Sequence, residues 1–314
     1  MFWSGLIATY ALTSICLLKW PHWIHPRRSR RPCYKHISHR GGAGEGPENT
    51  LLTFRRAIAL GTDMLEIDCH LTQDHIPVVV HDANLKRLTG VDALVRDVKF
   101  QDLPPLLPRL PLDFVPGQAY HVPKDMECAK LMALEDVFRQ FPGIGVNIDI
   151  KVHDEKLVQA VSEIVTRYDA LDTTVWGSFR QNTTDLCHAT NPDIGLFASF
   201  PRVLKILLLF YLGLLPFVPL KETHFEIPMP RIFATSVIRD PPQGVIRSAL
   251  ARTANFLLMS PILFKHLEKR GIQTYIWVLN NEEEFERAFL CGATGIMTDY
   301  PSKLKLFQLS QGMA

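Results

Sequence analysis

The 314-residue sequence has few cysteines and no paired cysteine motif. Its six cysteines lie far apart and form no C-x-x-C pair, at positions 16, 33, 69, 128, 187 and 291. This spacing argues against a disulfide framework or a zinc site and predicts reduced, mostly buried thiols. The chain also lacks an internal repeat, and its 22 prolines and 18 glycines argue against a coiled coil or a helical solenoid.

An excess of charge of either sign is missing as well. The chain has 34 basic and 32 acidic side chains, which leaves a formal net charge of +2. A nucleic-acid-binding protein would show a large basic excess, so no nucleic-acid partner is expected. Because 47% of the residues are hydrophobic and 21% are charged, the chain can bury a sizeable core and is not disordered as a whole. These properties predict an α/β globular protein of one large domain or two ordinary ones.

Residues 1–18 form an apolar stretch without a charged side chain. A basic cluster follows this stretch and consists of Arg27, Arg28, Arg30, Arg31 and Lys35. A cleaved signal peptide would carry its positive charge before the apolar stretch, and here the charge comes after it. The pattern therefore favours a transmembrane anchor over residues 1–20, a basic linker over residues 21–35, and a cytosolic location for the rest of the chain.

Residues 203–220 form a second apolar run, with one charge at Lys205 and with a glycine and two prolines near its end. One interpretation is a buried core helix. Leucine and phenylalanine occur on every face of such a helix, however, and the prolines interrupt it, so we favour a membrane-associated insertion that enters one leaflet. Because the run lies between two expected strands, we expect its ends at the carboxyl ends of those strands.

Between residues 36 and 300, short β-branched runs alternate with helical patterns. Eight parallel strands with intervening helices over about 270 residues predict a (β/α)8 TIM barrel, which we place at residues 36–309. The expected strands are His36–Arg40, Met64–His70, Val146–Lys151, Thr174–Ser178, Gly195–Ser199, His224–Pro228, Gln273–Leu279 and Gly295–Thr298. The expected helices include Asn49–Leu60, Ala133–Phe141, Asp154–Tyr168, Pro261–Arg270 and Glu282–Cys291.

One further run, Val78–Asp82, follows the second strand too closely to be parallel to it. A parallel crossover needs a dozen or more residues, so this run must return as an antiparallel β-hairpin. A turn centred near Asp74–His75 places His81 opposite Asp68. His81 then lies at the carboxyl end of the second strand, and in barrel enzymes the carboxyl ends of the strands form the mouth that carries the catalytic groups.

Three of the expected strands carry polar side chains near their carboxyl ends. These are His39 and Arg40 in the first strand, Glu66 and Asp68 in the second, and Asp149 and Lys151 in the third. Residues i and i+2 of a strand share a face, so the two acids of the second strand point the same way. Three carboxylates at one mouth supply the oxygen ligands that Mg²⁺ or Ca²⁺ binds. The alternative is a salt-bridge network in which Arg40 and Lys151 neutralise the acids without a metal.

Two histidines join this cluster. A single histidine at a strand end is more often structural, but His39 and His81 converge with an arginine, a lysine and three acids. Such a set favours general acid–base catalysis on a phosphate. Arg40 and Lys151 would hold the non-bridging phosphate oxygens, and a metal would withdraw charge from the phosphorane.

Several motifs resemble those of the glycerophosphodiester phosphodiesterase family, in the family's order and over residues 36–303. The opening block is HRGGAGEGPENTLLTFRRAIALGTDMLEIDCHLTQDHIPVVVHDANLKRLTG, and the later blocks are NIDIK, IQTYIWVLN and GATGIMTDYP. The two apolar segments resemble those of the small membrane-bound animal group that acts as lysophospholipase D. The resemblance implies a barrel hydrolase that depends on a divalent cation, Ca²⁺ or Mg²⁺. We expect it in the endoplasmic reticulum or perinuclear membrane, with the catalytic domain facing the cytosol.

The resemblance also implies roles for individual residues. By motif position, the catalytic set is His39, Arg40, His81 and Lys151, and the metal ligands are Glu66, Asp68 and Asp149. The family usually has Glu where this chain has Asp149, which keeps the charge but shortens the reach by one methylene. His81 is an alternative metal ligand. Glu48 is expected to be an outer ligand or a hydroxyl binder, and Trp277 and Asn280 are expected to bind substrate, with ordinary barrel packing as an equal alternative for the last two.

The expected reaction is the hydrolysis of lysophospholipids to lysophosphatidic acid and the head-group alcohol. Expected substrates are lysophosphatidylcholine, lysophosphatidylethanolamine and N-acyl forms, and the other expected partner is a membrane. Two other reactions stay open: hydrolysis of water-soluble glycerophosphodiesters, and phospholipase C-like release of a phosphorylated head group. A non-catalytic lipid-binding scaffold is a further alternative, against which the intact polar cluster argues.

Overall fold

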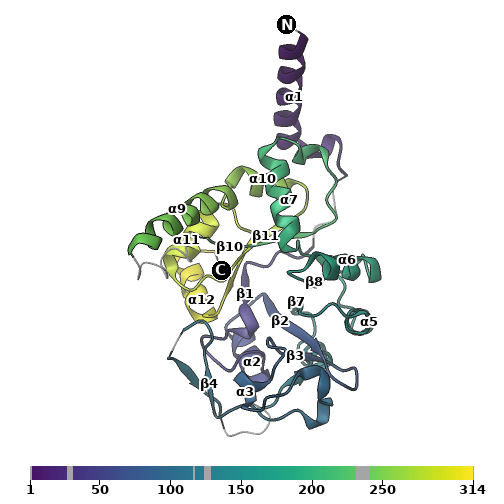
Figure 1. Cartoon of the computed structure of the whole chain (residues 1–314), viewed down its shortest axis with the longest axis vertical. Coiled ribbons are helices and arrows are strands. Elements are labelled where there is room, and N and C mark those ends of the chain that lie inside the picture. Colours follow the sequence, from purple (N-terminus) through teal and green to yellow (C-terminus); the bar gives the residue numbers. More distant parts are fainter. Residues whose placement is uncertain (1, 27–30, 116, 124–128, 231–240, 314) are drawn as a thin grey trace.

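Eight parallel strands form a nearly closed barrel that is surrounded by helices (Figure 1). The computed structural model describes residues 2–26, 31–115, 117–123, 129–230 and 241–313, with only the backbone described at residue 2 and residues 241–249. In order around the barrel, the strands are β1 (His36–Ser38), β2 (Met64–Leu71), β7 (Gly145–Ile150), β8 (Thr174–Gly177), β9 (Gly195–Leu196), β10 (His224–Pro228), β11 (Gln273–Trp277) and β12 (Gly295–Thr298). The predicted (β/α)8 barrel and its eight strands are confirmed.

The barrel closes between β9 and β10 through a single parallel bridge. This bridge pairs Phe197 with His224, and the N–H of Ala198 donates to the carbonyl of His224 at 3.0 Å. The other neighbouring strands share longer runs of paired residues, such as the six pairs between β2 and β7. Buried aromatic and aliphatic side chains fill the barrel interior near the amino ends of the strands, among them Ile37, Met64 and Tyr275.

Helices cover the outside of the barrel, and most of them bury an apolar side against it. They are α2 (Leu51–Ala59), α4 (Leu134–Gln140), α5 (Glu155–Arg167), α6 (Gln181–Thr190), α7 (Phe200–Tyr211), α9 (Pro241–Leu258), α10 (Pro261–Lys269), α11 (Glu282–Leu290) and α12 (Pro301–Ser310). In α5, Leu157, Val161 and Val165 recur every four residues on the buried side. Asp154 caps this helix by accepting the backbone N–H groups of Lys156 and Leu157 at 2.8 and 3.2 Å.

An insertion between β2 and β7 covers one side of the mouth. It contains β3 (Pro77–Val79), α3 (Lys86–Thr89), η3 (Val95–Asp97), η4 (Phe100–Asp102), β4 (Arg109–Pro111), β5 (Ala119–His121) and β6 (Met132–Ala133). β3 pairs with both β2 and β6, and β4 and β5 form a separate antiparallel ribbon. The described part of the insertion has its own small apolar core beside the barrel.

The predicted hairpin between β2 and β3 is present, but its register differs by one residue. Cys69 pairs with Val79, and the N–H of Val80 donates to the carbonyl of Asp68. His81 therefore lies one residue beyond the position opposite Asp68, where the sequence predicted it. The difference arises because the turn is centred on Asp74, whereas the sequence placed its centre between Asp74 and His75. In this turn His75 adopts a left-handed backbone conformation, with φ at 62°.

Helix α1 (Phe2–Lys19) packs against the end of the barrel opposite the mouth, and Figure 1 shows it projecting from the end of the molecule opposite α2 and α3. The hydroxyl of Ser14 donates to the carbonyl of Gly213 at 2.7 Å, and Lys269 at the end of α10 donates to the carbonyl of Lys19 at 2.8 Å. None of the described helices combines the length and apolarity that a membrane span requires, so the expected transmembrane anchor over residues 1–20 is not supported. Most of the basic cluster after it, residues 27–30, lies outside the described part of the chain.

The apolar run at residues 203–220 belongs to the barrel's own helical layer. It forms most of α7 and the short turn η5 (Leu215–Phe217), with Val203, Ile206 and Leu215 buried. The other side of α7 exposes Leu204 and Leu208. Only the beginning of α7 lies at the mouth, because the helix runs antiparallel to the strands and ends beside α1 at the far end of the barrel. The expectation that both ends lie at the mouth is therefore wrong.

The cysteines are free thiols wherever the structure describes them. Cys69 and Cys187 are buried, Cys33 is exposed, and Cys16 and Cys291 are half-buried. The absence of disulfides among these residues agrees with the prediction, although fewer of the thiols are buried than the sequence indicated. Cys128 lies outside the described residues.

Candidate active site

A sharp backbone turn after β1 brings His39 and Arg40 into the mouth. Arg40 adopts a left-handed conformation at φ 49°, within the turn η2 (His39–Gly41). Gly41 also has a positive φ, and a Cβ atom there would lie 2.4 Å from the ring of Phe54. The glycine is therefore required where the chain turns tightly against α2, and the turn orients the two preceding side chains.

Alternation along β2 and β7 places acidic side chains inside the barrel. Glu66 and Asp68 point inward, whereas Ile67 and Cys69 pack outward in the core under the helices. Asp149 lies directly across from Asp68 on the neighbouring strand. The structure therefore places the acids of β2 and β7 at one mouth, as the sequence predicted.

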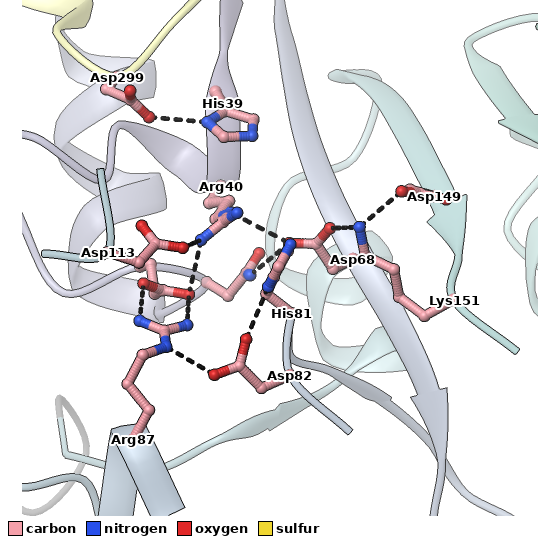
Figure 2. Close-up of polar contacts among 12 residues, drawn as sticks. His39, Arg40, Asp68, His81, Asp82, Arg87, Asp113, Asp149, Lys151 and Asp299 are labelled. Carbon is pink, nitrogen blue, oxygen red and sulfur yellow. Dashed lines mark hydrogen bonds and ion pairs between the residues drawn. The ribbon is translucent and has the colours of Figure 1, made fainter. Parts of the chain in front are cut away.

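Lys151 joins the two strands by a pair of short ionic contacts. Its Nζ lies 2.7 Å from Asp68 Oδ1 and 2.6 Å from Asp149 Oδ2 (Figure 2). Asp68 Oδ2 accepts a hydrogen bond from Asn49 Nδ2 at 3.0 Å and lies 3.5 Å from Arg40 Nε. Asp68 is only 1% exposed, so these contacts form in a largely water-free environment.

His39 is held by Asp299, which directly follows β12, the last strand of the barrel. Its Nδ1 lies 2.7 Å from Asp299 Oδ1, and its Nε2 faces Glu66 Oε2 at 3.8 Å. Asn280 in turn donates to Asp299 Oδ2 at 2.8 Å. The side chain of Asn280 therefore supports the partner of His39, and substrate binding by Asn280 stays a prediction.

His81 has a matching arrangement with its own neighbour. Its Nδ1 lies 2.7 Å from Asp82 Oδ1, and Arg87 Nε donates to Asp82 Oδ2 at 2.6 Å (Figure 2). In both histidines the carboxylate engages Nδ1, so the tautomer protonated at Nδ1 is favoured and Nε2 is available for reaction. The sequence identified both histidines but neither of their aspartates.

Arg40 is held by three carboxylates, those of Asp68, Glu48 and Asp113. Its Nη1 donates to Asp113 Oδ2 at 2.9 Å and to Glu48 Oε1 at 3.2 Å, while Arg87 binds both oxygens of Glu48 at 2.7 and 2.8 Å. Glu48 thus holds two arginines, and its buried carboxylate is occupied by them. Asp113 comes from the turn between β4 and β5, a segment without any sequence signal for function.

Burial and neighbouring charges lower the pKa of one acid of this cluster and raise the pKa of the acid beside it. Burial alone would raise the pKa of Asp68, but Lys151 and Arg40 outweigh burial and hold the pKa well below its usual range. Burial and the neighbouring Asp68 instead raise the pKa of Glu66 to about 7. For His39, burial would lower the pKa, yet Glu66 and Asp299 outweigh it, so the net effect is a raised pKa. Two adjacent acids with separated pKa values are typical of catalytic sites.

The predicted metal ligands Glu66, Asp68, His81 and Asp149 are near one another but do not form a ready-made coordination group. Within the described residues, no three histidine, cysteine or acidic side chains are arranged to hold a metal ion. Lys151 lies between Asp68 and Asp149, and His81 Nδ1 is bonded to Asp82. These contacts form the salt-bridge network that the sequence left open as the alternative.

The donor set nevertheless fits a divalent cation. Asp149 Oδ1 is buried and has no hydrogen-bond partner among the described residues. Carboxylates outnumber permanently positive side chains in the cluster, which comprises Glu48, Glu66, Asp68, Asp82, Asp113, Asp149 and Asp299 around Arg40, Arg87 and Lys151. A surplus of negative charge made of hard oxygen donors, several of them buried, is what Mg²⁺ or Ca²⁺ binds.

A further acid that the sequence analysis missed lies on β10. Glu226 accepts a hydrogen bond from Asn147 Nδ2 at 2.7 Å. Burial raises its pKa to about 8, and Glu66 and Asp149 act in the same direction. The signal for it was the position of a charged residue within the apolar strand HFEIP. Trp277, the predicted pocket wall, is half-buried at the end of β11, beside the apolar residues of the barrel interior.

This barrel, with its acid–base and cationic groups gathered at the carboxyl ends of the strands, places the chain among enzymes that cleave phosphate esters. Residues 39–303 match the Glycerophosphoryl diester phosphodiesterase family, and the chain belongs to that family. The predicted family is therefore confirmed.

Curated relatives extend the similarity over nearly the whole chain. The chain is 47% identical to human Lysophospholipase D GDPD1 over 95% of its own length and 93% of that protein. It is 36% identical to human Lysophospholipase D GDPD3, over 98% and 95% of the two chains. The fold matches the crystal structure of a putative glycerophosphoryl diester phosphodiesterase from Silicibacter pomeroyi, with a TM-score of 0.64, 21% identity and coverage of 91% and 97%.

Proposed function

We propose that this protein is a metal-dependent lysophospholipase D. It hydrolyses lysophosphatidylcholine, lysophosphatidylethanolamine and N-acyl forms to lysophosphatidic acid and the head-group alcohol. The observation that carries this proposal is the pair of histidines at one mouth, each bonded through Nδ1 to an aspartate. The names of the two human relatives support the choice of substrate.

The two histidines divide the proton transfers. One accepts at Nε2 the proton of the attacking water, or of the substrate's own free glycerol hydroxyl in a route through a cyclic phosphate. The phosphorus–oxygen bond to the head-group alcohol breaks, and the other histidine, which enters the step as the imidazolium, donates its Nε2 proton to the leaving alkoxide. On the cyclic route, water then opens the cyclic phosphate to give lysophosphatidic acid. Asp299 and Asp82 hold the two rings in orientation and stabilise each imidazolium as it forms.

The cationic side chains bind the phosphate. Arg40 is fixed by Glu48 and Asp113 before substrate arrives, so little side-chain freedom is lost on binding. Lys151 supplies a second positive charge from the neighbouring strand. Glu66, Asp68 and Asp149 are the residues that would hold a divalent cation, which when bound supplies Lewis-acid stabilisation of charge on the phosphoryl oxygens.

The products distinguish this reaction from its alternatives. With purified protein and lysophosphatidylcholine, we expect release of choline and lysophosphatidic acid, measured by a choline assay and mass spectrometry. Release of phosphocholine and monoacylglycerol instead would establish phospholipase C-like cleavage. Turnover of glycerophosphocholine without any turnover of lysolipids would indicate a water-soluble substrate. No turnover of either substrate would favour the non-catalytic lipid-binding scaffold.

We also propose that the protein is attached to a membrane, that of the endoplasmic reticulum or perinuclear region, with the barrel on the cytosolic side. Support comes from the exposed apolar side chains of α1, among them Ile7, Leu12 and Ile15. Leu204 and Leu208 of α7 are exposed as well, and α1 is joined to the end of α7 because Tyr10 stacks on Phe217 and donates to the carbonyl of Leu212. An apolar surface of this kind is suited to a bilayer interface.

Removal of this surface is expected to weaken membrane binding. Co-sedimentation with phosphatidylcholine vesicles should fall after deletion of residues 2–19 and should fall further when Leu204→Ser and Leu208→Ser are added. Leu290→Ser and Leu306→Ser form the matched control, because these leucines are 78% and 65% exposed on α11 and α12. Vesicle binding that falls equally in the control would contradict attachment through α1 and α7.

A further inference from the structure

Two exposed phenylalanines stack on each other at the rim of the mouth. Phe179 follows β8, and Phe200 is the first residue of α7. Their ring centroids are 4.9 Å apart at an interplanar angle of 11°, and the residues are 58% and 45% exposed. The two rings therefore form one apolar surface, built from two successive loops at the carboxyl ends of the strands.

Hydrogen bonds in both loops hold this surface in place. The N–H of Phe200 donates to the carbonyl of Phe179 at 3.2 Å, which ties the loops together. Ser178 Oγ donates to the carbonyl of Ile150 at 2.7 Å, and Ser199 Oγ donates to Gln181 Oε1 at 2.5 Å. The rings are thus positioned before any ligand binds, which lowers the entropic cost of a contact with them.

The surface adjoins the proposed phosphate-binding residues. Gly177 pairs with Asp149 in the sheet, so Phe179 lies two residues beyond the strand position next to Asp149. The carbonyl that Ser178 binds belongs to Ile150, the residue between Asp149 and Lys151. A phosphodiester held by Lys151 therefore has the phenylalanine pair on its side of the mouth.

An acyl chain bound at this mouth needs an apolar surface on the protein. The mouth and the apolar surface of α1 lie at opposite ends of the barrel, and the six residues of β7 alone span roughly 20 Å. Without a protein contact, the acyl chain of a lysophospholipid bound at the mouth would be exposed to water. Burial of apolar surface on the two rings would stabilise it.

We propose that Phe179 and Phe200 bind the acyl chain of the lysophospholipid and so determine the preference for acylated over deacylated glycerophosphodiesters. This inference rests on the proposed lysophospholipase D function and identifies residues that give that function its selectivity. Neither residue belongs to the polar cluster that would hold the reacting phosphate. The pair is thus a determinant of specificity, separate from the acid–base groups.

The test compares two substrates in the double variant Phe179→Ala and Phe200→Ala. For a long-chain lysophosphatidylcholine below its critical micelle concentration, kcat/KM should fall roughly 10- to 100-fold, as expected when apolar contacts in a pocket are lost. For glycerophosphocholine, kcat/KM should stay within about twofold of the unmodified enzyme, because this substrate has no acyl chain to contact the rings. The loss should increase from short- to long-chain lysolipids.

Matched variants separate the acyl contact from general effects. Phe256→Ala removes a more exposed phenylalanine, 75% exposed, which lies away from the mouth beside Leu257, whose carbonyl accepts the hydroxyl of Tyr211 at the far end of α7. It should leave both activities unchanged. The conservative pair Phe179→Leu and Phe200→Leu should retain most of the acyl preference, and the single variants Phe179→Ser and Phe200→Ser provide the same comparison if the double alanine variant fails to fold.

Three results would overturn the proposal. Equal loss on both substrates at unchanged thermal stability would show that the rings position the catalytic groups. An unchanged acyl preference would show that the chain binds elsewhere, and parallel loss of activity and vesicle binding would show that the rings contact a bilayer. The proposed function fails in a different way, when the unmodified enzyme releases choline from glycerophosphocholine but from no lysophospholipid.

Discussion

Replacement of His39 or His81 by Ala is expected to lower kcat roughly 10²- to 10⁴-fold, the usual contribution of a general acid or base. Each ring is bonded to a carboxylate through Nδ1, at 2.7 Å in both cases, so each presents Nε2 for proton transfer. Choline release from lysophosphatidylcholine measures the loss. His22→Ala, an exposed histidine of the turn η1 (Pro21–Trp23) at the opposite end of the barrel, is the matched control and should be fully active.

The pH profile of Asp299→Asn assigns the role of His39. Asp299 is one of the groups that raise the pKa of His39, so loss of its charge lowers that pKa. If His39 is the base, it must be neutral to act, and the acidic limb of kcat/KM should move to lower pH. If His39 is the acid, it must be protonated, and the alkaline limb should move to lower pH instead. An unshifted profile would contradict a catalytic role for His39.

A leaving group of low pKa distinguishes the two histidines further. Protonation of such a leaving group contributes little, so the variant that lacks the acid should recover activity on a substrate of this kind. If His81→Ala activity recovers instead when the metal concentration is raised, His81 is mainly a metal ligand. Full activity of both alanine variants on every substrate would contradict acid–base catalysis by these two histidines.

Glu66→Gln and Asp68→Asn are expected to lower turnover roughly 10³-fold or more, because stabilisation by a metal contributes several kcal/mol. The two variants should differ in stability. Glu66 accepts the N–H of Arg40, and burial with Asp68 raises its pKa to about 7, so a neutral glutamine is tolerated. Asp68 is paired with Lys151 and lies near Arg40, so its replacement removes charge-assisted contacts at a buried position and should destabilise the fold by about 1.5–3 kcal/mol, although Asp149, Glu48 and Asp113 still pair with the two cations.

Denaturant unfolding and metal titration provide the measurements for this pair. A chelator should abolish activity of the unmodified enzyme, and added Mg²⁺ or Ca²⁺ should restore it. Glu66→Gln should unfold like the unmodified protein and require more metal or remain inactive. Activity that survives both substitutions and the chelator would mean that the acids serve only as the salt-bridge network seen around Lys151.

The sequence was sufficient to predict the direction of the site side chains that lie in or next to regular strands. A strand places residues i and i+2 on one face, so Glu66 with Asp68 and Asp149 with Lys151 had to point together. The same periodicity, with the helical patterns between, predicted the eight strands. His39 and Arg40 were identifiable because they end a strand, although the backbone leaves the strand at Ser38 and turns through a left-handed residue.

The partners of the histidines were harder to predict because contact depends on distance in space. Asp299 lies 260 residues from His39 in the chain, and only closure of the barrel brings β12 beside β1. Asp299 follows a strand end within the motif GATGIMTDYP, so the sequence marked its position, but nothing in the sequence indicated that it pairs with His39. Asp113 had no signal, because it belongs to an irregular insertion whose path is decided by packing on its own small core.

By itself the sequence determined the barrel and the family and identified the candidate catalytic side chains, since each follows from local periodicity or from motifs with fixed spacing. The tertiary structure alone decided that Lys151 lies between Asp68 and Asp149, that Glu48 holds two arginines, and that α7 ends at the far end of the barrel. Each of these depends on how strands and helices distant in the chain pack together. Local patterns carry no information about that packing, because the free energy of burial depends on the area covered and not on the order of residues.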